Sequence, residues 1–389
     1  MSYRDTYFLI VTTLVVAFVI PVIVFVIELD WLNFVCSVQT TKETGKVVSA
    51  LTNERNLTLM APRRYGKTGL IRNVFHSLPK EYAPIYVDIY STANLNEFTQ
   101  AFASAVVGAL DTTVDRALTA IGRFFKAVRP TVTPDGTGGV SFSFAVEKAA
   151  TEATLKGVFD YLASKDRRIV VAVDEFQQIM DYPEKGTEAW LRSHIQFLEN
   201  TSFIFAGSRH HMMGEMFTSP RHPFYQSTDI MSLDVIAPDS YLAFAERFFR
   251  EAGRAFSPEA FMALYNRFDG VTWYLQSVLN RIWGEGGALE SERDLAGAVE
   301  SLVEDRALTF HDLLVAQTEV GKNLLRAIAV EGKVKELTAG EFLRRHSLTA
   351  PSSVRTALPS LIEHDLVYRA ADGYMVYDYL FAEYLRKRK

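Results

Sequence analysis

A glycine, a lysine and a threonine stand in a row at Gly66, Lys67 and Thr68, shortly after the apolar stretch Leu57–Met60. This order is typical of a strand, a tight loop and a helix, in which backbone N–H groups converge on one point. Such a loop binds polyphosphate, while the lysine adds a point charge and the threonine hydroxyl can bind Mg²⁺. We therefore predict that Lys67 contacts the β- and γ-phosphates of ATP and that Thr68 is a Mg²⁺ ligand.

The loop follows the pattern G-x-x-x-x-G-K-[ST] except at its first position, where Ala61 replaces glycine. A methyl group should fit there, although a positive φ would be strained. An ordinary lysine-bearing loop before a helix is the alternative interpretation. The residues predicted to contact the nucleotide are Pro62, Arg63, Arg64, Tyr65, Gly66, Lys67, Thr68 and Gly69.

Two carboxylates, Asp174 and Glu175, follow the apolar run Ile169–Val173. A continuous β-branched run is typical of a central strand in a parallel sheet, and ligands bind at the carboxyl ends of such strands. We predict that Asp174 holds the Mg²⁺ shell and that Glu175 is the general base for the attacking water. An acidic pair can also be a surface feature, but its combination with the phosphate loop indicates ATP hydrolysis. Asp88 ends another apolar run and is expected either to support the metal ligands or to be structural.

Three segments carry a family resemblance: Ala61–Ile71, Val173–Ile179 and Phe205–Arg209. They resemble the STAND/AAA-like P-loop ATPases of archaea and bacteria, which have a P-R-R-x-G-K-[ST] loop, a D-E-[FL]-Q motif and a G-S strand end. A Pro-Phe-Tyr element at residues 223–225 also matches. The resemblance spans Phe34 to the C-terminus and implies an ATPase core, a small helical lid and a C-terminal winged helix.

Ser208 and Arg209 follow the next predicted strand. Ser208 stands where a polar residue can sense the γ-phosphate, and an arginine can stabilise charge in the transition state of phosphoryl transfer. Arg192 and Arg221 are candidates for the same role, and a surface ion pair is the alternative for each arginine. The predicted catalytic residues are thus Lys67, Glu175, Ser208 and Arg209.

The chain has 389 residues, which is long enough for two or three compact units. Its formal net charge of −5 argues against bulk electrostatic binding of nucleic acid. The single cysteine excludes an internal disulfide and fits a reducing compartment.

Residues 7–27 contain no charged side chain and are mostly apolar. Their length, about twenty residues, is that of a membrane-spanning helix. We expect a transmembrane segment within residues 1–33 that anchors the protein in the cytoplasmic membrane with its ATPase body in the cytosol. If this segment is a mis-called start, the protein is cytoplasmic.

The rest of the chain divides into a P-loop ATPase core over residues 34–237, a helical lid over 238–316 and a winged-helix domain over 317–389. The predicted fold class is α/β, with a P-loop NTPase parallel sheet flanked by helices. Residues 129–144 alternate in polarity and predict a β-hairpin. We expect it to be a solvated decoration, and an edge that docks a partner is the alternative. Residues 292–315 are expected to form one linking helix.

The leading functional hypothesis is a switch in which Mg²⁺-ATP binds between core and lid, and hydrolysis rearranges lid and winged helix to control a protein partner or self-association. DNA binding gated by ATP is an alternative, although the predicted recognition helix over residues 352–364 offers only Arg355. The basic tail at residues 386–389 is expected to be solvated. A membrane-tethered scaffold with a static nucleotide is the third hypothesis.

Overall fold

The computed structural model describes residues 41–111, 113–125, 128–134, 140–370 and 372–387. The chain divides into two compact units between Val235 and Ile236, and each is described by itself. The membrane span predicted over residues 7–27 lies outside the described residues. Among the residues that are described, no helix has the length and apolar character needed to cross a membrane.

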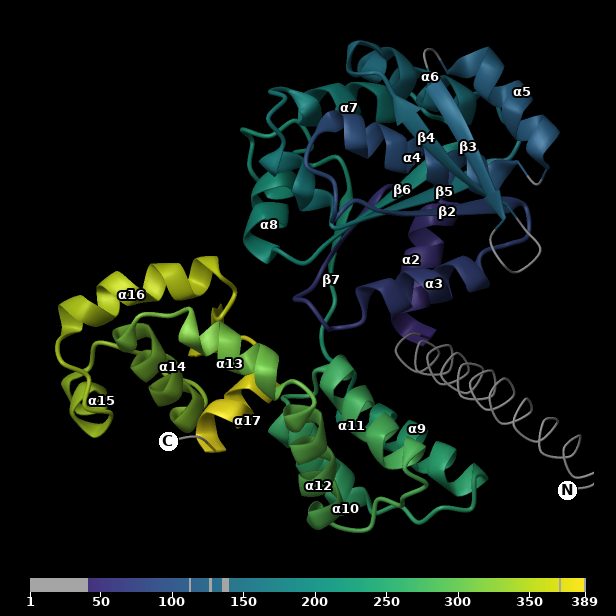
Figure 1. Ribbon diagram of the computed structural model, residues 1–389. Helices are drawn as coiled ribbons and strands as arrows, with labels where there is room; N and C mark the ends of the chain where they lie inside the picture. Colours follow the sequence, from purple (N-terminus) through teal and green to yellow (C-terminus); the bar gives the residue numbers. More distant parts are fainter. Residues whose placement is uncertain (1–40, 112, 126–127, 135–139, 371, 388–389) are drawn as a thin grey trace, which may run out of the picture. The chain divides into compact units, whose positions relative to one another are not determined.

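The first unit is built on five parallel strands in the order β2-β5-β6-β1-β7 (Figure 1). Their bounds are β1 Leu57–Met60, β2 Tyr82–Asp88, β5 Arg168–Asp174, β6 Thr201–Gly207 and β7 Asp229–Ser232. Strand β6 is buried along its whole length and β5 from Ile169 onward, as expected for the centre of a parallel sheet. The predicted α/β parallel sheet is confirmed. The sequence analysis missed the edge strand β7, because its side chains are largely exposed and show no apolar run.

Helices cover both faces of this sheet (Figure 1). Residues that alternate along β5 belong to two different apolar clusters, because successive side chains of a strand point to opposite faces. Val170 and Ala172 pack with α2 (Thr41–Thr52) and α3 (Lys67–Ser77). Val171 and Val173 belong to the cluster on the other face, whose helices are α4 Leu95–Leu110, α5 Val114–Phe124, α6 Thr151–Ala163, α7 Thr187–Ile195 and α8 His210–Thr218.

The predicted hairpin is present as β3 (Val128–Pro134) paired with β4 (Val140–Val146). The expectation that it is a solvated decoration is wrong. Phe142, Phe144 and Val146 are buried in the large apolar cluster, and β4 lies along α4. The alternation of apolar and polar residues in β4 therefore gives the hairpin one face that belongs to the core.

The second unit begins with the predicted lid helices α9 (Pro238–Glu251), α10 (Pro258–Arg267) and α11 (Thr272–Gly284). The single linking helix expected over residues 292–315 is wrong, because the chain forms α12 (Glu292–Glu304) and α13 (Ala307–Val315). The break falls at Asp305, whose carboxylate pairs with Arg281 of α11 and so holds the end of α12.

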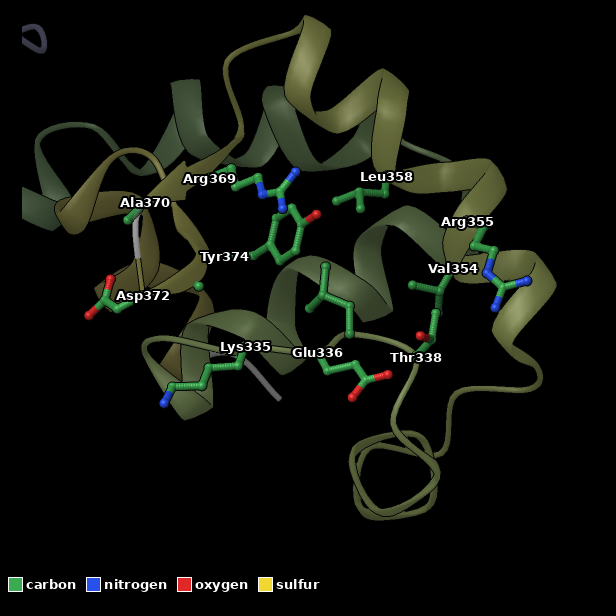
Figure 2. A pocket seen from close by; sticks show the side chains of 12 residues that line it. Lys335, Glu336, Thr338, Val354, Arg355, Leu358, Arg369, Ala370, Asp372 and Tyr374 are labelled. Atoms are coloured by element: carbon green, nitrogen blue, oxygen red, sulfur yellow. The ribbon is translucent and has the colours of Figure 1, made fainter. Parts of the chain in front are cut away.

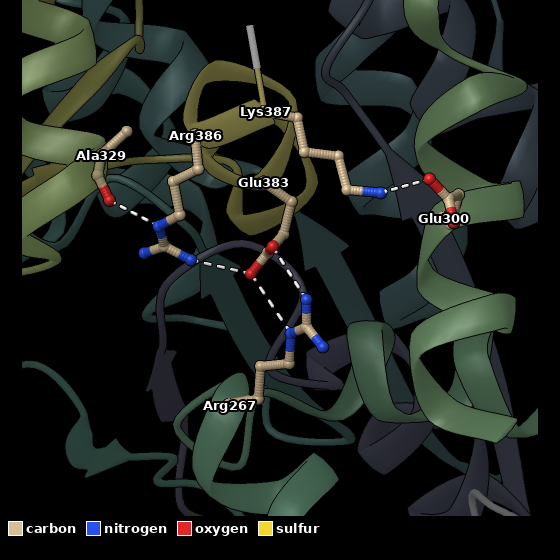
Figure 3. Close-up of polar contacts among 6 residues, drawn as sticks. All are labelled: Arg267, Glu300, Ala329, Glu383, Arg386 and Lys387. Atoms are coloured by element: carbon tan, nitrogen blue, oxygen red, sulfur yellow. Dashed lines mark hydrogen bonds and ion pairs between the residues drawn. The ribbon is translucent and has the colours of Figure 1, made fainter. Parts of the chain in front are cut away.

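The winged helix comprises α14 Glu319–Glu331, α15 Gly340–Arg345, α16 Pro351–Glu363, β8 Val367–Ala370, β9 Gly373–Val376 and α17 Tyr379–Lys387. Its three helices and strand pair were predicted. Helix α17 was not predicted from the sequence. It contacts both the other winged-helix elements and the lid helices of this unit (Figure 3).

Figure 3 shows how α17 makes these bonds. Glu383 is 7% exposed and accepts hydrogen bonds from Arg267 of α10, at 3.2 and 2.8 Å, and from Arg386 at 2.7 Å. Lys387 donates to Glu300 of α12 at 2.6 Å. Arg386 and Lys387 are exposed, as expected for this tail, but both also make bonds to other elements of the unit.

Candidate active site

The loop that joins β1 to α3 has two residues in the left-handed region, Arg64 at φ 73° and Gly66 at φ 93°. Glycine adopts this conformation at no steric cost, which explains its place directly before the helix. Ala61 is fully buried and is not among the residues with positive φ. The alanine that departs from the loop pattern is therefore accommodated without backbone strain.

Lys67 is the first residue of α3, and it is buried, with its ammonium group donating to the Ala61 carbonyl at 3.3 Å. Burial lowers the pKa of Lys67, and the negative charges of Glu175 and Asp174 oppose that shift. A buried ammonium is stabilised by a further anion, because desolvation penalises the charged form. The site is therefore suited to a phosphate group.

Asp174 ends β5 and is buried, and its carboxylate accepts three hydrogen bonds. Thr68 Oγ1 and Tyr86 OH both donate to Oδ2 at 2.9 Å, and the Glu175 backbone N–H donates to Oδ1 at 3.0 Å. Because the Thr68 hydroxyl donates a hydrogen bond to the carboxylate, the lone pairs of its oxygen stay available to a metal ion. Thr68 and Asp174 thus fit a Mg²⁺ ion, which binds to few protein oxygens and keeps several waters.

Glu175 follows Asp174 with a left-handed backbone at φ 56°. Its Oε2 atom accepts hydrogen bonds from Gln177 Nε2 at 2.5 Å and from Ser208 Oγ at 2.6 Å. Burial alone would raise the pKa of Glu175. The hydrogen bonds from Ser208 and Gln177 and the charge of Lys67 outweigh burial, so the pKa lies below its ordinary value. Glu175 is therefore held as a carboxylate that can accept a proton from water.

Gln177 is 1% exposed, and the backbone next to it has no room for a side chain. A methyl group on Gly207, at the end of β6, would lie 2.4 Å from Gln177 Oε1 and 2.5 Å from Met213 Cγ and Sδ. Glycine at position 207 therefore allows the close approach of Gln177 to β6, since a Cβ there would force Gln177 and Met213 to move. The sequence places Gln177 at the end of the D-E-[FL]-Q motif but does not indicate what it does. Its contact with Glu175 is visible only in the fold.

The structure brings together Lys67, Thr68, Asp174, Glu175 and Ser208. They come from α3 and from the carboxyl ends of β5 and β6, as expected for an open parallel sheet. Arg63 of the loop lies over the Tyr90 ring at 5.4 Å, and its charge acts on both Lys67 and Glu175.

Arg209 is placed differently from the other predicted catalytic residues. Its guanidinium is 44% exposed and pairs with Asp181 at 2.9 Å.

Asp88 accepts a hydrogen bond from the Tyr90 backbone N–H at 2.8 Å, and burial raises the pKa of Asp88. The group on β2 that contacts Asp174 is instead Tyr86, which sequence reasoning missed.

No group of three or more histidine, cysteine, aspartate or glutamate side chains arranged to hold a metal occurs among the described residues. Mg²⁺ bound to nucleotide does not need such a group, because one or two carboxylates and the phosphates supply its ligands. His222 is engaged in ion pairs with Glu188 at 2.9 Å and Glu215 at 3.6 Å.

Two family models match the chain. Residues 48–278 match an ATPase domain predominantly from Archaea, and residues 308–387 match a probable winged helix domain. No curated protein matches the chain. The assignment to the STAND class stays a prediction.

Solved structures show the same fold. The Walker-type ATPase PABY2304 of Pyrococcus abyssi aligns over 90% of this chain and 96% of its own, with 17% identity and a TM-score of 0.61. The ORC2 protein of Aeropyrum pernix, solved as ADPNP and ADP complexes, aligns over 89% and 91%, with 17% identity and a TM-score of 0.55. The fold, the site and the match over residues 48–278 lead to one conclusion: the chain belongs to the family of ATPase domains found predominantly in Archaea.

Proposed function

We propose that this protein hydrolyses ATP with the help of Mg²⁺. The observation that carries the proposal is that the Lys67 ammonium lies in the field of the Asp174 and Glu175 carboxylates. At the same place, the Thr68 hydroxyl donates a hydrogen bond to Asp174 at 2.9 Å. A cation, a hydroxyl and two carboxylates at one sheet edge, next to a phosphate-binding loop, are the groups that phosphoryl transfer to water needs.

Each of these residues has a distinct proposed role. Lys67 and the backbone of the loop bind the phosphates, and Thr68 and Asp174 hold Mg²⁺, which when bound would neutralise phosphate charge. Glu175 takes the proton from the attacking water, and Ser208 sets the position of the Glu175 carboxylate through its bond at 2.6 Å. Arg209 stays a sequence-based prediction for stabilising the transition state.

The proposed output of ATP turnover is a contact with a protein partner or with a second copy of the chain. The bonds of α17 make it unfavourable for lid and winged helix to separate, since Glu383 would lose its Arg267 partner. We therefore propose that lid and winged helix act as one body in this contact. Attachment to the cytoplasmic membrane through residues 1–33 stays a prediction from the sequence.

The experiment that tests the proposal compares Glu175→Gln with the wild type. The variant should bind a fluorescent ATP analogue with an affinity within about two-fold of the wild type and lose about 10²–10⁴-fold in turnover, the usual contribution of a general base. Glu152→Gln makes the same change at an exposed position of α6 and should retain full turnover. Turnover that is equal in all three proteins would remove Glu175 from the base role. Wild-type hydrolysis at background would favour a static nucleotide.

A second candidate function, DNA binding through the winged helix, has one observation in its favour. The winged helix has a groove of about 760 Å³. Its lining includes Arg355 of α16, Arg369 of β8 and Lys335, which Figure 2 labels. Sequence reasoning had found only Arg355 on this face. Two acidic residues, Glu336 and Asp372, also line the groove and reduce its positive charge.

Retention on DNA tests this candidate. If the groove binds phosphates, wild-type protein should be retained at low salt and released as salt rises, because added salt makes the release of DNA counterions, which drives such binding, less favourable. Combined Arg355→Ala and Arg369→Ala should abolish retention, whereas Arg247→Ala, at an exposed position in α9, should not. Absence of wild-type retention at low salt would reject DNA as the partner.

A further inference from the structure

The hydroxyl of Tyr86, on β2, donates a hydrogen bond to the Asp174 carboxylate. The roles proposed above for the phosphate loop and the carboxylates do not explain why a tyrosine makes this contact. Tyr86 OH lies 2.9 Å from Asp174 Oδ2, the same oxygen that accepts a hydrogen bond from the Thr68 hydroxyl. The two donors come from different elements, β2 and α3, and they meet on one carboxylate oxygen.

Strand register explains how this contact arises. Tyr86 pairs with Ala172 and Asp88 pairs with Asp174, so all four residues share one face of the sheet. Asp174 is the next same-face residue after Ala172, which places its carboxylate within reach of a tyrosine hydroxyl on the neighbouring strand. The contact therefore depends on the order β2-β5 in the sheet.

Tyr86 is one of three donors that hold the Asp174 carboxylate. Burial raises the pKa of Tyr86, and the negative charge of Asp174 raises it further. With Tyr86 and Thr68 both donating to Oδ2, and the Glu175 N–H donating to Oδ1, the Asp174 carboxylate is fixed in rotation about its side-chain bonds.

We propose that Tyr86 is a positioning residue for Mg²⁺: it holds Asp174 so that a free lone pair of the carboxylate and the Thr68 hydroxyl face the same metal. This inference rests on the proposed ATPase function. Hydrogen-bond partners behind metal ligands typically change metal affinity by 10–100-fold when they are removed. Tyr86 is half-buried and is one of three donors, so we expect the lower end of that range.

The test uses the full chain and the fluorescent nucleotide mant-ATP. Its dissociation constant is measured with excess EDTA and with saturating Mg²⁺, and the ratio of the two constants gives the coupling between metal and nucleotide. Tyr86→Phe removes only the hydroxyl and should reduce this ratio about ten-fold. The constant in EDTA should stay within about two-fold of the wild type, because Tyr86 acts through the metal ligands.

Tyr82→Phe is the matched control. Tyr82 lies on the same face of β2 and packs against the same apolar cluster, but four residues before the site. It should leave the ratio unchanged. A ratio that is equal in wild type, Tyr86→Phe and Tyr82→Phe would overturn the inference, as would a loss of affinity that is equally large in EDTA. Failure of the wild type to bind mant-ATP under either condition would overturn the proposed function, and this inference with it.

Discussion

Gly207 offers the sharpest test of how the site is built, because a single methyl group there would act on Glu175, the proposed base, without touching it. The added Cβ in Gly207→Ala would lie 2.4 Å from Gln177 Oε1 and 2.5 Å from Met213. Both contacts are far inside the ordinary van der Waals distance, so both side chains must move. Gln177 is nearly fully buried and donates to Glu175 at 2.5 Å, so its displacement also moves the proposed base.

The magnitude follows from these contacts. Forcing an extra methyl group into a well-packed core costs about 1–3 kcal/mol. For a unit of this size, about 2 kcal/mol corresponds to a fall in melting temperature of about 6 °C. Loss of the Gln177 hydrogen bond releases Glu175 from its position, and we expect kcat to fall by about ten-fold, or ~1.4 kcal/mol in the barrier.

Gly214→Ala is the control for this prediction. It makes the same substitution in the interior of α8, where an added Cβ meets nothing within 4 Å. Because alanine favours helix more than glycine does, this variant should be more stable by about 0.5–1 kcal/mol and fully active. Melting temperature by calorimetry and kcat by phosphate release measure both effects. A Gly207→Ala variant as stable and as active as Gly214→Ala would refute the arrangement of Gln177 and Glu175 described above.

Two further predictions address the base and the second unit. Ser208 donates to Glu175 and lowers its pKa from the ordinary 4.5, so Ser208→Ala should raise that pKa. A base acts only when deprotonated, so on acidification kcat of the variant should begin to fall at a higher pH than kcat of the wild type. Ser193→Ala, at an exposed position of α7, is the control, and a pH–rate profile identical to that of the control would contradict this. Glu383→Gln removes the partner of two arginines that are 35% and 39% exposed, so it should cost about 2 kcal/mol, less than a fully buried pair, and lower the melting temperature by about 5 °C. Glu319, which pairs with Lys322, has a side chain that is 79% exposed, so Glu319→Gln should leave the melting temperature unchanged; equal melting temperatures for the two variants would count against the role of α17.

The parts of the fold that could be predicted are those whose signal is local. Strand β1, the loop and α3 follow one another in the sequence, and β5 is a continuous β-branched run that ends in two carboxylates. Local patterns also predict the hairpin and the helices of the winged helix. In each case the signal is a periodicity or a turn residue within a dozen positions.

The parts that could not be predicted depend on which strands lie next to each other. The contact of Tyr86 with Asp174 joins residues 88 positions apart and requires β2 to neighbour β5. The need for glycine at position 207 arises from Gln177, which reaches β6 from the short helix Phe176–Asp181. Strand β7 has only two apolar residues, Ile230 and Met231, and its side chains are largely exposed because it lies at the sheet edge.

The central claim is that nucleotide phosphates bind at Lys67, and the most direct measurement is the rise in melting temperature caused by Mg²⁺-ATP. At a ligand concentration about 100 times the dissociation constant, binding stabilises the native state by about 2.7 kcal/mol, which corresponds to a rise of about 5–10 °C. The wild type and the control Lys46→Ala, changed at an exposed position of α2, should both show this rise. Lys67→Ala should show none, and an equal rise in all three proteins would place the nucleotide elsewhere.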